Sequence, residues 1–253
     1  MSSQSRDNGA LAGPVVTAAS PWLMYRALVG IGLLCGLLIA TVYRVTLPVI
    51  EANKAEALER AVFRVLPAAR SSVSFAMDAD GRFAQLDRGS RRNSGHKADG
   101  AASGNRLVYA GYDEQGQLVG LAIEAEGMGY QDLIRILYGY SFDDRAIIGM
   151  RVLESRETPG LGDKIEKDAT FLANFERLDV SLDNDGAIAH PIEAVKRGEK
   201  VSPWQVDAIT GATISSHAIA DILRRSSIFW IPRVVGRRAD FRLPRASHND
   251  AAQ

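Results

Sequence analysis

The sequence predicts an α+β protein in which one N-terminal transmembrane helix precedes a domain built on an antiparallel sheet. Three observations indicate this: an uncharged apolar run, two pairs of strand-like segments that each enclose a short polar turn, and helical stretches that follow those strands. Successive strands followed by helices favour an antiparallel sheet over a doubly wound parallel one. We divide the 253 residues into an N-terminal tail 1–21, a transmembrane helix 22–46, a domain 47–231 and an Arg-rich, flexible tail 232–253.

The apolar run from Ala27 to Tyr43 contains no charged residue. A helix of this length spans about 26 Å, so with Trp22 or the flanking turns it is just long enough to cross a lipid bilayer. A cleaved signal peptide is the alternative, but the run begins late, exceeds a usual signal core and lacks a clear cleavage site. We therefore expect an uncleaved anchor. The basic residues on its two sides balance and leave its orientation open: Arg6, Arg26, Arg44 and Lys54.

Each later element has a local signal. Residues 52–66 place apolar side chains at three- and four-residue steps, which predicts an amphipathic helix that Pro67 ends. The polar, glycine-rich stretch around 82–106 predicts an exposed basic loop, solvated rather than a binding surface. The remaining segments are two hairpins and two helices: strands 107–112 with 118–124 and 133–141 with 146–154, then helices near 168–175 and 216–227.

Charge and cysteine content exclude several classes of function. The 30 basic and 30 acidic residues cancel, so no nucleic-acid partner is indicated. Cys35 is the single cysteine and lies in the apolar run, which rules out an intramolecular disulfide and an iron–sulfur cluster held by this chain alone. The four histidines have no convincing metal-ligand spacing. An electron carrier in this chain would have to be organic.

One short segment near the C-terminus carries most of the functional information. Residues 207–216 read DAITGATISS, with a glycine and an alanine between hydroxyl residues, just before an apolar-periodic run. This pattern predicts a tight turn that leads into a helix N-terminus, where free N–H groups face an anion. An isolated capped helix start would show the same four residues, Thr-Gly-Ala-Thr, so a second signal is needed to decide.

The second signal is Glu157-Thr158-Pro159-Gly160-Leu161-Gly162, followed by Asp-Lys-Ile-Glu. Together the two segments resemble the FMN-binding domain of the RnfG and NqrC subunits of bacterial respiratory complexes, which have D-x-x-[ST]-G-A-T-x-[ST] after E-T-P-G-L-G. In that family a threonine hydroxyl forms a phosphoester with FMN, and the resemblance makes Thr213 the attachment point. The Asp-Lys-Ile-Glu continuation is more similar to RnfG than to NqrC.

The resemblance implies roles for the neighbouring residues. Near Thr213, the remaining phosphate oxygens would be held by backbone N–H groups from Ala212 to Ser216 and by the hydroxyls of Thr210 and Ser215, with Gly211 in the same turn. The isoalloxazine ring would lie beside Glu157, Thr158, Gly160, Leu161 and Gly162. A further Gly-x-Gly segment, Gly127 and Gly129, would pass close to the flavin; it lacks the third glycine and the crossover helix of a Rossmann site, and a plain strand connection is the alternative. Asp207 would begin the motif read by a flavin transferase, or would form an Asx turn.

These implications define an electron-relay subunit of an Rnf-type, ion-translocating complex in the inner membrane, with covalent FMN in a domain on the periplasmic side. Its expected partners are the other subunits of the complex, the flavin transferase and the bilayer, and it is not expected to be catalytic alone. The alternatives are an NqrC-like subunit of a sodium-translocating quinone reductase, a stand-alone membrane-anchored FMN carrier, and a binding module without a redox role. The Arg-rich tail could also dock on partners or anionic lipid.

Overall fold

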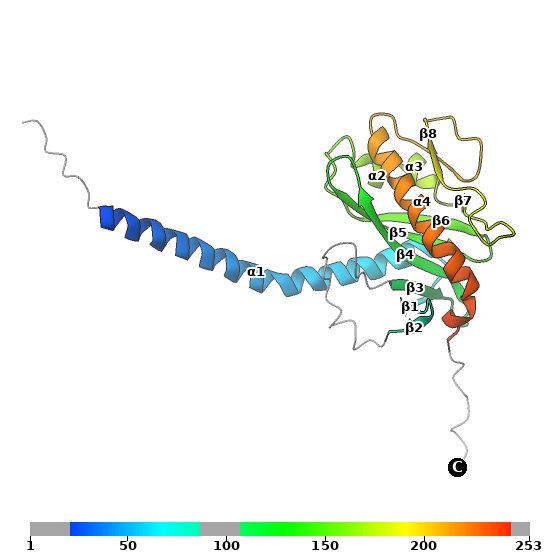
Figure 1. Ribbon diagram of the computed structural model, residues 1–253, viewed down its shortest axis with the longest axis horizontal. Coiled ribbons are helices and arrows are strands. Elements are labelled where there is room, and N and C mark those ends of the chain that lie inside the picture. Colours follow the sequence, from blue (N-terminus) through cyan, green and yellow to red (C-terminus); the bar gives the residue numbers. More distant parts are fainter. Residues whose placement is uncertain (1–20, 87–106, 244–253) are drawn as a thin grey trace, which may run out of the picture. The chain divides into compact units, whose positions relative to one another are not determined.

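The computed structural model describes residues 21–86 and 107–243 (Figure 1). Among the described elements a long helix comes first, the strands of the main sheet follow, and a second long helix and a short 3₁₀ helix come last. In order the elements are α1 Pro21–Val65, β1 Ser71–Met77, β2 Phe83–Gln85, β3 Leu107–Tyr112, β4 Leu118–Met128, β5 Leu133–Ser141, β6 Ala146–Glu154, α2 Lys164–Lys167, α3 Ala169–Ala173, β7 Leu178–Asp179, β8 Glu193–Val195, β9 Gln205–Asp207, α4 Thr213–Gly236 and the 3₁₀ helix η2 Arg238–Phe241.

The main sheet has seven strands in the order β2-β1-β3-β4-β5-β6-β7. Every neighbouring pair in it is antiparallel, which confirms the predicted α+β class. The strands β8 and β9 form a separate parallel pair. The sequence analysis missed β1, and β2 lies inside the stretch expected to be a loop. Most of that basic stretch, with Arg88, Arg91, Arg92 and Lys97, lies outside the described residues.

The helix α1 joins two elements that the sequence separated. It continues through Pro48 from the apolar run into the amphipathic segment and ends at Val65. The part of the chain that the structure describes contains one helix long and apolar enough to cross a membrane, Met24–Val65, whose best 18-residue stretch has a mean hydropathy of 2.1. Residues up to Lys54 form one compact unit, and residues from Ala55 onward form another.

The last turns of α1 pack on one face of the sheet. Ala61, Val62, Val65 and Leu66 are buried there against side chains of β3, β4 and β5. The backbone of Val65 approaches so closely that a Cβ on Gly139 would collide with its carbonyl oxygen, and a Cβ on Gly149 would lie 3.0 Å from it. Glycine is required at position 139, and a Cβ at position 149 would be tightly packed, because the helix end rests directly on the strands.

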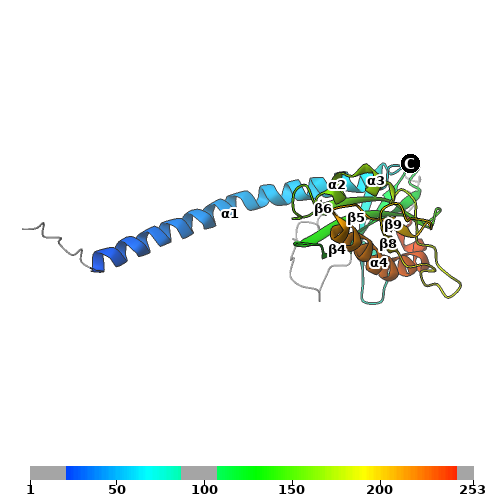
Figure 2. The same ribbon diagram turned by 90° about the horizontal axis from the view of Figure 1, so that it is seen from above.

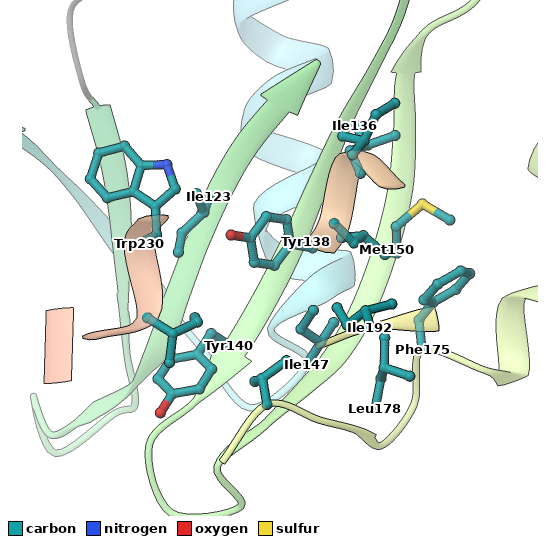
Figure 3. Close-up of a cluster of buried hydrophobic side chains, with 14 of the residues drawn as sticks. Ile123, Ile136, Tyr138, Tyr140, Ile147, Met150, Phe175, Leu178, Ile192 and Trp230 are labelled. Atoms are coloured by element: carbon teal, nitrogen blue, oxygen red, sulfur yellow. The ribbon is translucent and has the colours of Figure 1, made fainter. Parts of the chain in front are cut away.

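The opposite face of the sheet carries α4 and the main core. In Figure 2 the end of α1 and the helix α4 lie on opposite sides of the sheet. Alternate residues of β4, β5 and β6 point toward α4, as the two-residue period of a strand requires; Figure 3 shows Ile123, Ile136, Tyr138, Ile147 and Met150 gathered in this core. The Tyr138 hydroxyl lies 2.8 Å from Ser226 Oγ, which ties β5 to α4.

The C-terminal domain boundary expected at residue 231 falls inside helix α4. The helix α4 continues through Pro232 to Gly236, and Ile231, Val234 and Phe241 are buried. The buried Tyr112 hydroxyl donates a 2.6 Å hydrogen bond to the Phe241 carbonyl. Apolar side chains between the arginines therefore fix residues 232–243 to the sheet, and the proposed flexible tail could begin only after them.

Candidate functional site

The turn before α4 presents Thr213 at the start of the helix. Gly211 has a φ of +82°, a conformation that side chains rarely adopt, and this reverses the chain just after β9. Inside the turn, Ser216 Oγ accepts the Ile209 N–H at 3.0 Å and donates to the Ala212 carbonyl at 2.8 Å. The turn is thus held from within, while Thr213 remains exposed.

Within the described ranges 21–86 and 107–243, no side chain caps this end of α4. The N-cap residue is Ala212, which has no side-chain oxygen to accept an N–H of the first turn. The first N–H groups of a helix have no partner within the helix, and their aligned dipoles favour an anion. The exposed hydroxyl of Thr213 lies at this helix end. The residues present therefore fit a phosphate esterified at Thr213.

Glu157 joins the three glycine-bearing segments that the sequence singled out. Its side chain is 6% exposed. One carboxylate oxygen accepts the backbone N–H of Gln131 at 3.1 Å, and the other accepts the Ser215 hydroxyl at 2.5 Å. Gln131 follows the Gly127–Gly129 segment, and Ser215 belongs to the first turn of α4. One carboxylate therefore connects the tip of the β4–β5 hairpin, the 157–162 loop and the helix start.

Gly129 and Gly162 make this arrangement sterically feasible. A Cβ on either residue would collide with the Glu157 carboxylate, and a Cβ on Gly162 would also lie 2.9 Å from Ser215 Oγ. Both glycines thus admit the carboxylate to its buried position. The absence of a side chain at both positions is therefore a requirement of the protein structure itself. The close approach of a flavin to these glycines, which the sequence led us to expect, stays a prediction.

Gly127 has a different neighbour from the one expected. Its open side is filled by α4, where a Cβ would lie 2.7 Å from Ile222 and 2.8 Å from the Arg225 guanidinium. Protein atoms of α4 therefore pack closely against this glycine of β4. The expected approach of the flavin to Gly127 stays a prediction, as does the alternative of a plain strand connection.

The Ser215 hydroxyl is already used in a hydrogen bond inside the protein. Ser215 is 2% exposed and donates to Glu157, so its side chain faces the protein interior rather than the open helix end. Its expected contribution to phosphate binding is therefore limited to its backbone N–H. Thr210 and Gly211 are exposed beside Thr213, and Ala212 is buried.

The 157–162 loop presents an exposed apolar surface. Thr158 Oγ1 donates to the side-chain carbonyl of Gln131 at 2.8 Å, which fixes the loop to the hairpin tip. Gly160 has a φ of +78°, with open space where a Cβ would be. Leu161 is 52% exposed, and Ile214 on the first turn of α4 is 59% exposed. Apolar side chains on both segments are thus available to a planar ring.

A groove runs between α4 and β8, with a volume of about 580 Å³. His217 lines it one helical turn after Thr213, on the same side of α4. Its other lining residues come from α4, from β8 and from the two residues before β8: Pro191, Ile192, Glu193, Ala194, Ala220, Asp221 and Arg224. Space of cofactor size therefore begins close to this helix end.

Asp207, at the end of β9, stabilises the segment that leads into the turn before α4. Its carboxylate accepts the Gly198 N–H at 2.9 Å, nine residues earlier, so the Asx turn considered from the sequence does not describe it. The buried Asn174 amide accepts from the Asp207 N–H at 3.1 Å and from Lys200 Nζ at 3.1 Å. Burial lowers the pKa of Lys200, and the Asp207 charge opposes this shift. Its expected recognition by a transferase stays a prediction.

Sequence reasoning missed three residues that shape this site. Gln131 donates its N–H to Glu157, Asn174 fixes β9, and Lys164 lies beside Gly211. Their partners in these contacts are 26 to 47 residues away in the chain, so no local pattern marks them. Lys164 alone had a signal, because it belongs to the Asp-Lys-Ile-Glu stretch that was noticed for its similarity to RnfG.

Comparison with known proteins agrees with this geometry. Residues 129–226 match the family described as FMN-binding domain, and this range contains all three joined segments apart from Gly127. The G subunit of the ion-translocating oxidoreductase complex of Methanosarcina acetivorans is 38% identical over 120 residues, which cover 46% of this chain and 54% of that protein. The corresponding protein of Pectobacterium atrosepticum is 33% identical over 132 residues, covering 51% and 57%. The chain thus spans about half the length of these curated relatives.

The fold also has solved counterparts. The crystal structure of Shewanella oneidensis NqrC superposes with a TM-score of 0.54 at 20% identity, over 75% of this chain and 96% of that one. The C subunit of the Na⁺-translocating NADH-quinone reductase of Parabacteroides distasonis gives a TM-score of 0.51 at 18% identity, over 76% and 96%. At these identities the similarity concerns the fold alone.

Fold and sequence together define the class: an α+β protein in which residues 129–226 match the FMN-binding domain family and in which, among the described residues, one helix could span a membrane. Within that class the chain is similar to the RnfG proteins of ion-translocating oxidoreductase complexes, and it shares its fold with NqrC. The resemblance inferred from the two sequence segments is confirmed.

Proposed function

We propose that this chain is an electron-relay subunit of an Rnf-type, ion-translocating membrane complex, and that it carries FMN bound covalently through the Thr213 hydroxyl. The observation that supports the attachment point is the exposed Thr213 at the uncapped N-terminus of α4. The names of two curated relatives support the place in a complex, since they are subunits of ion-translocating oxidoreductase complexes.

The residues of this chain would bind and orient the cofactor. Thr213 would hold the phosphate by its ester bond, and the first N–H groups of α4 would stabilise the remaining phosphate oxygens. Leu161 and Ile214 would cover part of the ring. Glu157 would hold these two side chains in position, because its hydrogen bond to Ser215 fixes the 157–162 loop to the start of α4. FMN itself, when bound, supplies reversible electron transfer, so no acid or base of this chain needs to react.

The attachment point is tested by replacing single hydroxyl residues. Thr213→Ala should abolish covalent flavin and leave the fold intact, because it removes an exposed hydroxyl and little packing. Thr210→Ala is the matched control, since Thr210 is an exposed threonine of the same turn. The measurement is ultraviolet fluorescence of denatured protein in a gel. Fluorescence that survives in Thr213→Ala and disappears in Thr210→Ala would show that the assignment is wrong.

We further propose that α1 anchors the protein in the inner membrane and that the FMN-binding domain faces the periplasm, where the flavin transferase acts. Deleting residues 20–46 should then give a soluble, colourless protein in the cytoplasm. A cleavable export signal on the same truncated chain should restore covalent flavin. If the cytoplasmic form acquires covalent FMN without any exported transferase, the proposed orientation is wrong.

A further inference from the structure

Lys164 places its ammonium group against the turn that precedes Thr213. A Cβ on Gly211 would lie 3.6 Å from Lys164 Nζ, so the two segments meet at this point. We propose that Lys164 is the counter-charge of the phosphoester on Thr213 and so belongs to the phosphate-binding part of the site. This inference rests on the proposed flavin attachment, and it names the side chain that would recognise the phosphate.

The neighbours of Lys164 leave its charge available. Asp163 is the nearest carboxylate in sequence, but one of its oxygens accepts the Gly160 N–H at 2.7 Å and the other pairs with Lys167 Nζ at 2.7 Å. The hydrogen bond from Lys167 is the main reason why the pKa of Asp163 is lowered. Among the ion pairs formed by residues 21–86 and 107–243, none includes Lys164.

A phosphodiester at Thr213 needs such a charge. It carries one full negative charge, whereas a helix N-terminus supplies the equivalent of about half a positive charge. The nearby hydroxyls of Ser215 and Ser216 are already used by Glu157, Ile209 and Ala212. A lysine ammonium is a compact point charge that suits a phosphate, and charge-assisted hydrogen bonds are the strong ones.

Gly211 leaves the backbone of the turn open toward Lys164. Because Gly211 has no side chain, nothing at this residue separates the ammonium from the backbone of the turn. Lys164 is itself partly exposed, which leaves its long side chain room to adjust toward an ester on the neighbouring Thr213. The turn motif and the 157–166 segment therefore meet twice, through Glu157 in the interior and through Lys164 at the surface.

The first test measures whether flavin attachment protects Lys164. Full-length protein is produced with an exported flavin transferase, as wild type and as Thr213→Ala, and both are labelled with a trace of acetic anhydride. Mass spectrometry then compares acetylation of Lys164 with that of Lys167, the matched lysine one turn further along. We expect Lys164 to react about threefold to tenfold less in the flavinylated protein, with Lys167 unchanged. Equal reactivity of Lys164 in the two proteins would overturn the proposal.

The second test observes the phosphorus directly. The ³¹P resonance of the flavinylated full-length protein should shift in Lys164→Gln and stay close to the wild-type position in Lys164→Arg and in Lys167→Gln. A ³¹P resonance that does not shift in Lys164→Gln would refute the proposal that Lys164 is the counter-charge of the phosphate. A wild-type chain without covalent flavin would overturn both this inference and the proposed function, whereas a flavinylated chain with an indifferent Lys164 would overturn this inference alone.

Discussion

Replacing Glu157 with alanine should destabilise the domain and disturb the site together. The change removes a 6% exposed carboxylate that accepts hydrogen bonds from the Gln131 N–H and from Ser215 Oγ, a residue only 2% exposed. Both donors would lose their partner, and a cavity would remain between Gly129 and Gly162. The three segments that Glu157 joins would then be free to move apart.

The magnitude follows from these two hydrogen bonds. A bond to a charged group contributes about 1.5–3 kcal/mol, and removal of a buried carboxylate recovers part of its desolvation cost. We therefore expect Glu157→Ala to lower the free energy of unfolding by about 2–4 kcal/mol. Glu157→Gln should cost about 1 kcal/mol, because its carbonyl can accept from Gln131 while Ser215 accepts from its amide group.

The assay is urea unfolding of residues 55–253, which form their own compact unit. Tryptophan fluorescence monitors the unfolding. Glu166→Gln, an exposed glutamate of α2, is the control and should change stability by less than about 0.5 kcal/mol. Covalent flavin yield in the full-length variants is measured in parallel. A Glu157→Ala protein with the stability of the control and full flavin yield would refute the role of Glu157.

Three further outcomes are expected. Gly162→Ala should lower stability by about 1–3 kcal/mol and reduce covalent flavin yield, because its Cβ meets Glu157 and Ser215; a stable variant with full flavin yield would contradict this. Gly139→Val should lower the stability of residues 55–253 by displacing the end of α1. An unchanged urea midpoint of unfolding would show that the helix does not rest on Gly139. Burial raises the pKa of Tyr112 from 10.0, its value in the unfolded chain, to about 12. The neutral phenol therefore contributes fully to stability below pH 10, and this contribution is lost as the pH rises toward about 12. Unfolding measured at pH 9, 10.5 and 11.5 should show falling stability, and rising stability would contradict this.

The sequence predicted what local patterns can encode. The hairpin strands β3 to β6 were located to within a few residues, because alternation and turn residues are properties of neighbouring positions. The turn around Gly211 and the helix after it were also found, since both depend on residues close in the chain. The two-segment resemblance assigned the candidate site, which stays a prediction, and Thr213 is exposed at the start of α4.

What could not be predicted depends on distant contacts. Ser215 was expected to face a phosphate, yet its hydroxyl is taken by a carboxylate 58 residues away. Gly127 was expected to face a flavin, but the packing of α4 fills its open side. The arginine-rich end was interpreted from its charge, whereas Phe241 and its contacts with the sheet decide its structure. In each case the tertiary partner overrides a local pattern.

The central claim is that Thr213 carries FMN. The most direct measurement is tandem mass spectrometry of the protein purified from the membrane of a cell with an exported flavin transferase. The account predicts a peptide spanning residues 207–216 whose mass exceeds the unmodified value by FMN minus one water, with fragment ions that place the addition on Thr213. The same peptide found only unmodified, or modified at Thr210, Ser215 or Ser216, would contradict it.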